Sequence, residues 1–161
     1  MVSRVFSAGL SGIDGYIVTV ECFLSGGLPR LDVVGLPTGA VSEAGERVRA
    51  AAKACAFDWP VSRLTVNLAP ADTKKAGTAY DLPLLLSILA AAGEIDAPPD
   101  NALFFGELSL TGELRPVCGA LSMALAARDA GFKTVFVHAM NASESSYASV
   151  VTVFPIRTLN E

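Results

Sequence analysis

The sequence predicts a two-layer α/β fold in which helices cover one mixed sheet. Its first 35 residues read as apolar strands separated by glycine-rich turns, and the rest alternates between strands and segments with helical spacing. Of the 161 residues, 52% are hydrophobic and only 17% are charged. That composition is sufficient for a substantial core, so we expect one compact domain over residues 1–161.

Apolar runs that end at turn residues mark the strands. The clearest run places Tyr16, Val18, Val20 and Cys22 at alternate positions, as expected of a strand with one buried face. A Ser-Leu-Thr-Gly turn separates two further runs and predicts a hairpin. The predicted strands are Arg4–Leu10, Ile13–Leu24, Arg30–Val34, Arg63–Leu68, Leu103–Leu108, Glu113–Val117, Lys133–His138 and Val150–Phe154.

Four segments have the spacing of helices. The first, Ala40–Ala56, places Glu43 and Arg47 as an i,i+4 pair on its polar side. The second, Leu82–Ala92, is apolar nearly all round and should be buried. Asp81 is its predicted N-cap, because the proline that follows then falls in the first turn. The other two are a helix through Leu121, Leu125 and Arg128 that ends at Gly131, and a short helix capped by Asn141 that runs to Tyr147.

Charge and cysteine content exclude several classes of protein. The formal net charge of −4 is unfavourable for a free-standing nucleic-acid binder that relies on overall electrostatic attraction. The single histidine, His138, and three cysteines without a CxxC pair do not make a usual zinc pattern. The odd number of cysteines suits a reducing cytosol, and Cys22, Cys55 and Cys118 are expected to pack as small hydrophobic residues.

The chain also lacks the sequence signals of secretion or membrane insertion. Met1–Arg4 is not followed by the long apolar region of a signal peptide. The longest apolar run, Leu82–Ala92, is much shorter than the ~20 residues that span a bilayer. We therefore expect a cytoplasmic protein with no membrane partner.

The most informative segment runs from Val66 to Pro83: an apolar strand, a polar loop with Lys74 and Lys75, and a helix start. Such a loop is where many α/β proteins bind an anion or place a nucleophile. This one has a single glycine and no GxxxxGK[ST] motif, which favours a solvated surface loop over a phosphate site. Oxygen donors for a metal would be Asp58, Asp72 and Asp81, but their spacing matches no ligand loop and we expect no metal.

A hydroxyl nucleophile with a lysine base is the third kind of chemistry considered for this loop. Thr78 with Lys74 or Lys75 is the local candidate, since both types of group are present near the helix start. Adjacent lysines in a polar loop are expected to remain hydrated and protonated, which makes them poor bases. We therefore expect no catalytic residue here, and the dyad is kept as an alternative.

Short motifs occur along nearly the whole chain: Gly26–Pro29, Val34–Pro37, Glu46–Ala51, Val66–Asp72, Tyr80–Pro83, Gly106–Val117, and Asn141–Ala142 followed by Glu144. Through these motifs the chain resembles the N-terminal domain of the magnesium-chelatase-like AAA+ ATPases, the ComM/YifB family. The resemblance covers essentially all 161 residues. The segment after His138 departs from the family pattern, which usually has a proline and a second Glu-Ala-Ala-like run there.

In that family, this domain resembles the proteolytic domain of Lon proteases. The resemblance implies a fold that is shared with GHMP kinases and contains a left-handed βαβ crossover. Ala79 stands at the position of the Lon serine nucleophile, and Leu121 at the position of the Lon lysine. Because alanine cannot attack a carbonyl and leucine cannot accept a proton, the resemblance implies a domain without the Lon dyad.

The resemblance implies a longer protein, a hexameric AAA+ motor that acts on DNA in branch migration during natural transformation. ATP and magnesium would bind in a further domain, C-terminal to these residues, and no cofactor is expected here. The partners would be that ATPase domain, neighbouring subunits and DNA. The expected contact surface combines the loop residues with basic residues of the first helix, all assumed exposed: Asp72, Lys74, Lys75, Thr78, Arg47, Arg49 and Lys53. The alternative is a peptidase or hydrolase that uses Thr78 with Lys74 or Lys75.

Overall fold

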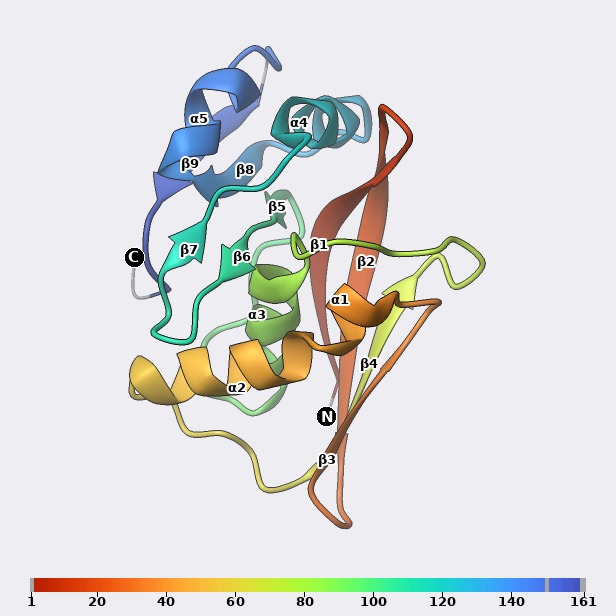
Figure 1. Ribbon diagram of the computed structural model, residues 1–161, viewed down its shortest axis with the longest axis vertical. Helices are drawn as coiled ribbons and strands as arrows, with labels where there is room; N and C mark the ends of the chain where they lie inside the picture. The colour runs from red at the N-terminus through yellow and green to blue at the C-terminus, as the bar shows by residue number, and fades with distance from the viewer. Residues whose placement is uncertain (1, 150, 160–161) are drawn as a thin grey trace.

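The structure is a computed structural model that describes residues 2–149 and 151–159. The α/β class predicted from the sequence is confirmed, and strands and helices alternate after an initial group of strands (Figure 1). In chain order the elements are β1 (Val2–Ser11), β2 (Asp14–Ser25), β3 (Arg30–Val34), α1 (Gly39–Ser42), α2 (Ala44–Ala54), β4 (Arg63–Ala69), α3 (Asp81–Ala91), β5 (Ala102–Phe104), β6 (Glu107–Leu108), β7 (Leu114–Arg115), α4 (Ala120–Asp129), β8 (Thr134–His138), α5 (Ala139–Ser145) and β9 (Thr152–Ile156).

Seven of the described strands form one mixed sheet in the order β3-β4-β2-β1-β5-β8-β9. The long β1–β2 hairpin is antiparallel, and β2 pairs with β4 in the same way. The remaining neighbours are parallel, including β3 and β4, which are joined by α1 and α2 as a βαβ unit. The sheet is therefore antiparallel at its centre and parallel towards both edges.

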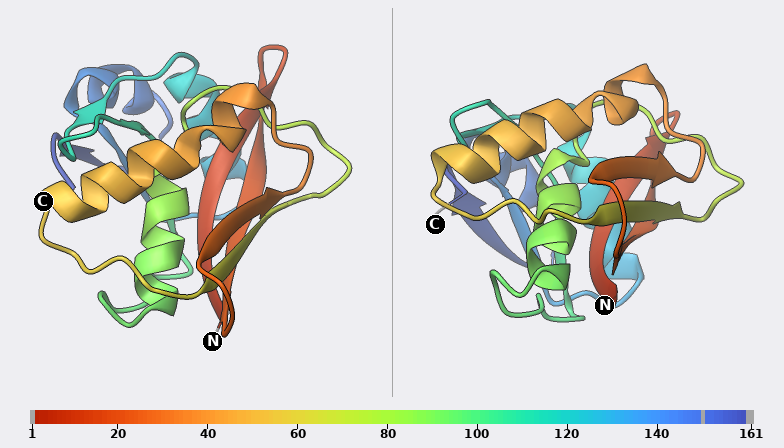
Figure 2. Two further views of the ribbon diagram at one scale, coloured as in Figure 1. Left: turned by 60° about the horizontal axis from the view of Figure 1, so that its bottom comes forward. Right: turned by 90° about the horizontal axis from the view of Figure 1, so that it is seen from below.

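Helices cover both faces of this sheet, so the predicted two-layer arrangement is wrong. Ser3 of β1 donates its hydroxyl to a carbonyl of α3, whereas Ala8 packs with α4 in a second buried cluster. Since side chains alternate along a strand, residues at odd and even positions lie on opposite faces. Figure 2 shows α2 lying across α3 on one side of the β1–β2 hairpin. The second helix layer was missed because it packs against small residues of the sheet, which give no strong hydrophobic pattern. For example, an added Cβ on Gly15 would lie 2.3 Å from the Ser122 carbonyl of α4.

Two predicted elements are each divided in the structure. The helix expected over Ala40–Ala56 is interrupted at Glu43, between α1 and α2. The strand expected over Leu103–Leu108 leaves the main sheet at Gly106, whose N–H donates to the Ala79 carbonyl at 2.9 Å and whose carbonyl accepts from Leu82. After this point β6 pairs with β7 in a separate small hairpin, so the predicted hairpin is present but much shorter.

The chain after β9 returns to this hairpin. The Leu114 N–H of β7 donates to the Arg157 carbonyl at 2.8 Å, and the Leu159 N–H donates to the Gly112 carbonyl at 2.8 Å. Glu113 and Thr158 form an antiparallel bridge between these two bonds. Residues 157–159 therefore align along β7. Val150, which the sequence placed in the last strand, lies outside the described residues.

The two predicted helix caps are also wrong. Asp81 is the first residue of α3 rather than its cap, and the residue before it, Tyr80, makes no side-chain capping bond. At α5 the cap is His138, whose Nδ1 accepts from the Met140 N–H at 3.0 Å. Asn141 instead lies inside the helix with its side chain buried. Among the helices that the structure describes, none has both the length and the apolar content needed to cross a bilayer.

Candidate functional site

A cleft of about 460 Å³ lies at the start of α3, at the position to which the sequence pointed. One wall comes from the end of β1 and another from the loop that enters α3. The remaining walls come from β6, from the connection between β7 and α4, and from α4 itself. The lining residues are Gly9, Leu10, Ala76, Gly77, Thr78, Ala79, Tyr80, Glu107, Pro116, Val117, Cys118 and Met123.

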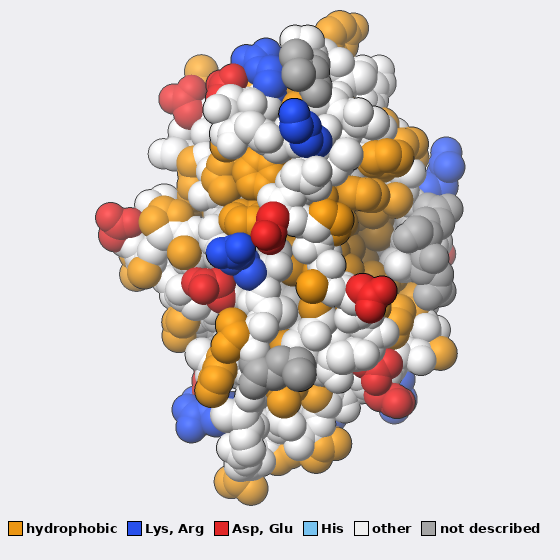
Figure 3. Space-filling view, turned by 180° about the vertical axis from the view of Figure 1, so that it is seen from behind, with side chains coloured by type: hydrophobic (Ala, Val, Ile, Leu, Met, Phe, Trp, Pro, Cys, Tyr) orange, Lys and Arg blue, Asp and Glu red, His pale blue; other side chains and the backbone are white. Residues whose placement is uncertain are grey.

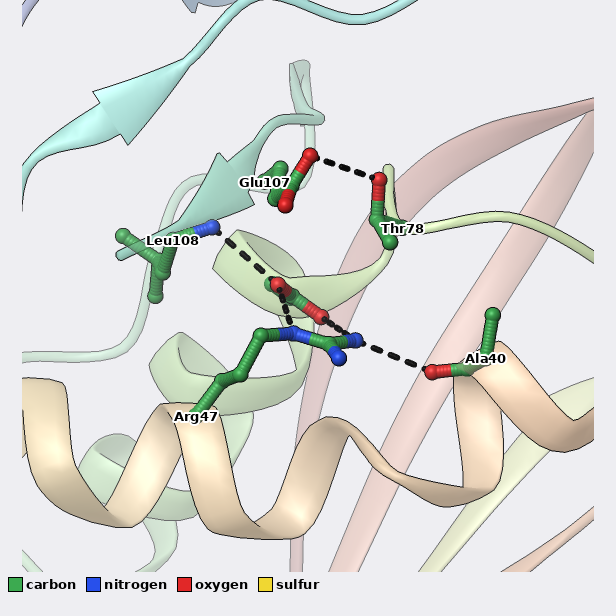
Figure 4. Close-up of polar contacts among 6 residues, drawn as sticks. Ala40, Arg47, Thr78, Glu107 and Leu108 are labelled. Carbon is green, nitrogen blue, oxygen red and sulfur yellow. Dashed lines mark hydrogen bonds and ion pairs between the residues drawn. The ribbon is translucent and has the colours of Figure 1, made fainter. Parts of the chain in front are cut away.

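Asp81 follows the cleft-lining residue Tyr80 in the chain and holds three elements together. Its carboxylate, which is 1% exposed, accepts from Arg47 Nε at 2.8 Å and from Arg47 Nη2 at 3.0 Å. It also accepts from the Leu108 N–H of β6 at 3.1 Å. Burial raises the pKa of Asp81, against the lowering effect of Arg47 and of the Leu108 N–H. The expected capping role is replaced by a buried ion pair that joins α2, α3 and β6 (Figure 4).

Arg47 is consequently not the exposed basic residue that the sequence suggested. Its side chain is 20% exposed, and its Nη2 also donates to the Ala40 carbonyl of α1 at 2.9 Å. The bond gives a hydrogen-bond donor to a carbonyl close to the break between α1 and α2, as Figure 4 shows. The hydrogen bond with Asp81 raises the pKa of Arg47. Arg49 and Lys53, by contrast, are exposed as expected.

Thr78 and Glu107 form a second polar contact, this one inside the cleft. The Thr78 hydroxyl donates to Glu107 Oε2 at 3.0 Å, and both side chains are half-buried (Figure 4). Thr78 stands three residues before the first residue of α3, and Glu107 is the first residue of β6. Chemically, this pair offers a hydroxyl and a carboxylate to a ligand in the cleft.

The two adjacent lysines of the loop have different environments, and the expectation that both are hydrated is wrong for Lys75. Lys75 is 0% exposed, and its Nζ donates to the Pro70 carbonyl. Its backbone also bonds to the β3–α1 connection, accepting from Thr38 at 2.8 Å and donating to Leu36 at 2.9 Å. Burial lowers the pKa of Lys75, and nearby Asp72 opposes that effect. Lys75 therefore pins the loop, whereas Lys74 and Asp72 are exposed.

This arrangement does not favour the alternative Thr–Lys dyad. The hydroxyl of Thr78 is engaged with a carboxylate, Glu107, and the ammonium of Lys75 is engaged with a backbone carbonyl. The Lys74 side chain is exposed, and its own carbonyl accepts from the Tyr16 hydroxyl at 3.3 Å. No described contact joins Thr78 to either lysine.

Of the two positions compared with the Lon dyad, only one is among the residues that line the cleft. Ala79 lines the cleft and is half-buried. Leu121 is a half-buried residue of α4 that does not line it; the α4 residue that does is Met123. Neither a methyl group nor an isobutyl group can act as a nucleophile or a base. Their correspondence with the Lon residues remains a prediction.

The aspartates considered as metal ligands are not brought together. Within residues 2–149 and 151–159, no group of three or more His, Cys, Asp or Glu side chains is placed to hold a metal ion. Asp81 is occupied by Arg47, while Asp58 and Asp72 are exposed. The arrangement thus gives these three carboxylates separate environments.

Sequence reasoning missed Glu107 and Tyr80 as parts of the site. Both occur in motifs that were singled out, but neither was given a role, because a single carboxylate or phenol in an apolar run carries no spacing signal. Tyr80 is buried, and burial raises its pKa, with a further contribution from Tyr16. Its hydroxyl would lie 2.0 Å from a Cβ added at Gly9, so the glycine makes room for it.

Comparison with known proteins places the cleft in a wider context. The family model described as subunit ChlI of Mg-chelatase matches residues 20–141, a range that includes Arg47, Thr78, Asp81 and Glu107. The chain is 41% identical over 161 residues to an uncharacterised protein of Mycobacterium tuberculosis, a match that covers 99% of this chain and 32% of the relative.

Two further relatives carry the names that the sequence motifs suggested. Competence protein ComM of Haemophilus influenzae is 40% identical over 156 residues, covering 96% of this chain and 30% of ComM. The uncharacterised protein YifB of Escherichia coli is 42% identical over 135 residues, covering 83% and 27%. The chain thus spans about a third or less of the length of these curated relatives. From the extent of the family match and the agreement among these relatives, the chain belongs to the family of the ChlI subunit of Mg-chelatase.

Proposed function

We propose that this chain is the non-catalytic, Lon-like N-terminal domain of a ComM-type AAA+ ATPase, and that it acts through contacts with partners. The observation that carries the proposal is the composition of the cleft at the start of α3. Ala79 stands in its wall, Leu121 is not among its lining residues, and the Thr78 hydroxyl is bonded to Glu107. A cleft with this lining has the shape of an active site but offers no nucleophile paired with a lysine base.

The Lon-like fold, with its left-handed βαβ crossover, is part of the same proposal. It is supported by the mixed sheet and by the βαβ unit in which α1 and α2 connect the parallel neighbours β3 and β4. The rest of the longer protein would carry the ATPase machinery with its ATP and magnesium, and would assemble as a cytoplasmic hexamer. The resemblance to ComM suggests DNA branch migration during natural transformation as the activity of the whole protein.

For this domain, we infer contact with the ATPase domain and neighbouring subunits in preference to broad electrostatic contact with DNA. The net charge of −4 is unfavourable for the latter. On the face shown in Figure 3, Lys and Arg side chains stand apart from one another among hydrophobic and acidic side chains. The exposed loop residues Asp72 and Lys74 and the exposed Arg49 remain the proposed contact points.

The absence of peptidase activity is the testable core of this proposal. The purified chain, incubated with unfolded casein, should give no turnover above that of a heat-denatured sample. The variant Thr78→Ala and a hydroxyl-directed inhibitor provide the controls. Turnover that the inhibitor blocks and Thr78→Ala abolishes would overturn the proposal in favour of a threonine peptidase.

The contact role is tested in the full-length protein. Charge reversal at exposed positions, Arg49→Glu or Lys74→Glu, should change the oligomer distribution in analytical ultracentrifugation or the ATPase rate. Lys133→Glu, at an exposed residue of the α4–β8 connection, serves as the matched control. If single-stranded DNA is shifted by the isolated chain at low salt and Arg49→Glu removes the shift, direct DNA contact would replace the subunit-contact proposal.

A further inference from the structure

We propose that the cleft holds the side chain of a lysine or arginine from an extended segment of a partner protein, with Glu107 as its counter-charge. The inference rests on the proposed contact function, because it states which chemical group of a partner the domain binds in this cleft. It is carried by the charge count at the start of α3, by the apolar walls of the cleft and by the lack of a cation in its lining.

The charge count leaves Glu107 largely uncompensated. Asp81 and Glu107 contribute two negative charges at this end of α3, and Arg47 contributes one positive charge that is bound to Asp81 by two hydrogen bonds. The positive end of a helix dipole is equivalent to roughly half a unit charge, and it is shared between the two carboxylates. A net negative charge therefore remains beside the cleft.

The hydrogen bonds of Glu107 point to the same conclusion. Its Oε2 accepts from the Thr78 hydroxyl, which is a neutral donor. Among the residues that line the cleft, all of them in the described part of the chain, there is no lysine, arginine or histidine. A half-buried carboxylate that takes part in no ion pair favours a cationic donor, because opposite charges at contact distance add their attraction to the hydrogen bond.

The walls suit the methylene stem of a basic side chain. Leu10, Ala79, Val117 and Met123 provide apolar surface around the single carboxylate. Lysine and arginine bury their stems along apolar surface while the charged head finds a polar partner. The volume of about 460 Å³ lies within the range of ordinary ligand pockets and is ample for one such side chain.

Other ligand classes fit this lining less well. A phosphate or carboxylate would meet Glu107 at short range, and the resulting repulsion argues against an anionic ligand despite the nearby helix end. A purely apolar ligand would remove water from Glu107 without replacing its hydrogen bonds, which is costly. A polyamine has at least two cationic groups, whereas the cleft offers one carboxylate. One basic side chain on a peptide matches one negative charge.

The hairpin also contains an internal competitor. Arg115 of β7 lies directly across from Glu107 of β6 in the antiparallel register. Its side chain is exposed, and the ion pairs found among the described residues do not include it. Glu107 therefore forms no ion pair with Arg115 in this structure, and Arg115 is the internal cation with which a partner's basic side chain competes.

The binding experiment uses the ¹⁵N-labelled chain and short peptides of one design. Gly-Gly-Arg-Gly-Gly and Gly-Gly-Lys-Gly-Gly, acetylated and amidated at their termini, are the cationic probes, and the equally blocked norleucine peptide is the neutral probe of similar stem length. We expect saturable shifts at the amides of Thr78, Glu107 and Cys118 with the cationic probes. The norleucine peptide should bind at least tenfold more weakly.

Variants separate the carboxylate from the rest of the hairpin. Glu107→Gln, which keeps an acceptor for Thr78, should weaken the cationic probes about tenfold, the equivalent of one modest charged contact. Glu113→Gln, an exposed carboxylate of the same hairpin, should leave binding unchanged. Arg115→Ala removes the competing cation and should tighten the binding of the cationic probes.

Cys118 gives a second readout that needs no variant. It is exposed and lines the cleft, whereas Cys22 is buried. A bound cationic peptide should slow the alkylation of Cys118 by iodoacetamide, measured by mass spectrometry, in proportion to cleft occupancy. This readout keeps the proposal falsifiable if Glu107→Gln does not fold.

Four results would overturn the inference. They are no binding of either cationic peptide at millimolar concentration, equal binding of the norleucine peptide, shifts at the same amides with inorganic phosphate, and tighter binding of spermidine than of the peptides. None of these outcomes bears on casein turnover. Failure of this inference is therefore distinguishable from failure of the proposed non-catalytic role.

Discussion

Two carboxylates lie at the start of the same helix, and their environments are opposite. Asp81 is 1% exposed and accepts three hydrogen bonds, two of them from Arg47. Glu107 is half-buried, accepts from one neutral hydroxyl and faces an open cleft. Closeness to a cleft therefore does not by itself make a charged group available to a ligand. All the contacts of Asp81 serve to join three elements of the fold. Glu107, by contrast, can accept further hydrogen bonds.

Removing the partner of Asp81 should have the largest effect. In Arg47→Met the buried carboxylate loses its counter-charge, and breaking a buried pair from one side typically costs about 3–5 kcal/mol. We expect the free energy of unfolding, measured by urea denaturation, to fall by about that amount. Arg49→Met, an exposed arginine on the same helix, should change it by less than about 0.5 kcal/mol. Equal effects of the two variants would mean that the Arg47–Asp81 pair does not stabilise the fold.

The stability of the buried core should also be sensitive to alkaline pH. Burial raises the pKa of Cys22, in the core beneath α3, from 9.0 to about 12. A raised pKa in the folded state means that the stabilisation is fully present below pH 9 and is lost as the pH rises towards 12. Each pH unit in that window should cost about 1.4 kcal/mol for this group.

The comparison of Cys22→Ala with the wild type between pH 8 and pH 10 isolates the effect of Cys22. Burial also raises the pKa of Cys55 and of Tyr80, but both residues are present in the two proteins, so their contributions cancel in the difference. Cys22→Ala should therefore lose less stability than the wild type between the two pH values. Cys118→Ala removes an exposed thiol and should behave as the wild type does. Parallel pH profiles for all three proteins would show that Cys22 does not control alkaline stability.

Substitution of Glu107 or Thr78, which line the cleft, should have the smallest effect on stability. Glu107→Gln keeps an oxygen that can accept from Thr78, so we expect a change in unfolding free energy within about 1 kcal/mol. Thr78→Val removes the hydroxyl and should cost a similar amount. A loss as large as that of Arg47→Met would place Glu107 in the same structural class as Asp81 and would remove the contrast between the two carboxylates.

Much of the fold was accessible from the sequence, because periodicity reports which face of an element is buried. The alternation in β2 and the helical spacing in α2 and α4 are local signals, and each predicted an element of the correct type. The second helix layer was not accessible in this way. That layer packs against small residues of the sheet such as Ala8 and Gly15. Their size permits close packing but gives no strong hydrophobic signal in the sequence.

The candidate site was located by sequence, but its chemistry was only partly predicted. The loop, Thr78 and Ala79 do line or border the cleft. The roles of Asp81 and Lys75 were misjudged, because a carboxylate before Pro83 resembles a cap and a lysine in a polar loop resembles a solvated side chain. Their partners, Arg47 and the Pro70 carbonyl, are specified only by tertiary structure: Arg47 lies 34 residues from Asp81.

The return of residues 157–159 to β7 has a mechanical consequence. The hairpin that receives them also presents Glu107 to the cleft and the Leu108 N–H to Asp81. With one side of β7 bonded to β6 and the other to residues 157–159, a pull on that stretch loads the hairpin directly. Tension applied near Leu159 would therefore reach the hairpin that forms part of the cleft through these backbone bonds, as well as β9, which ends three residues earlier.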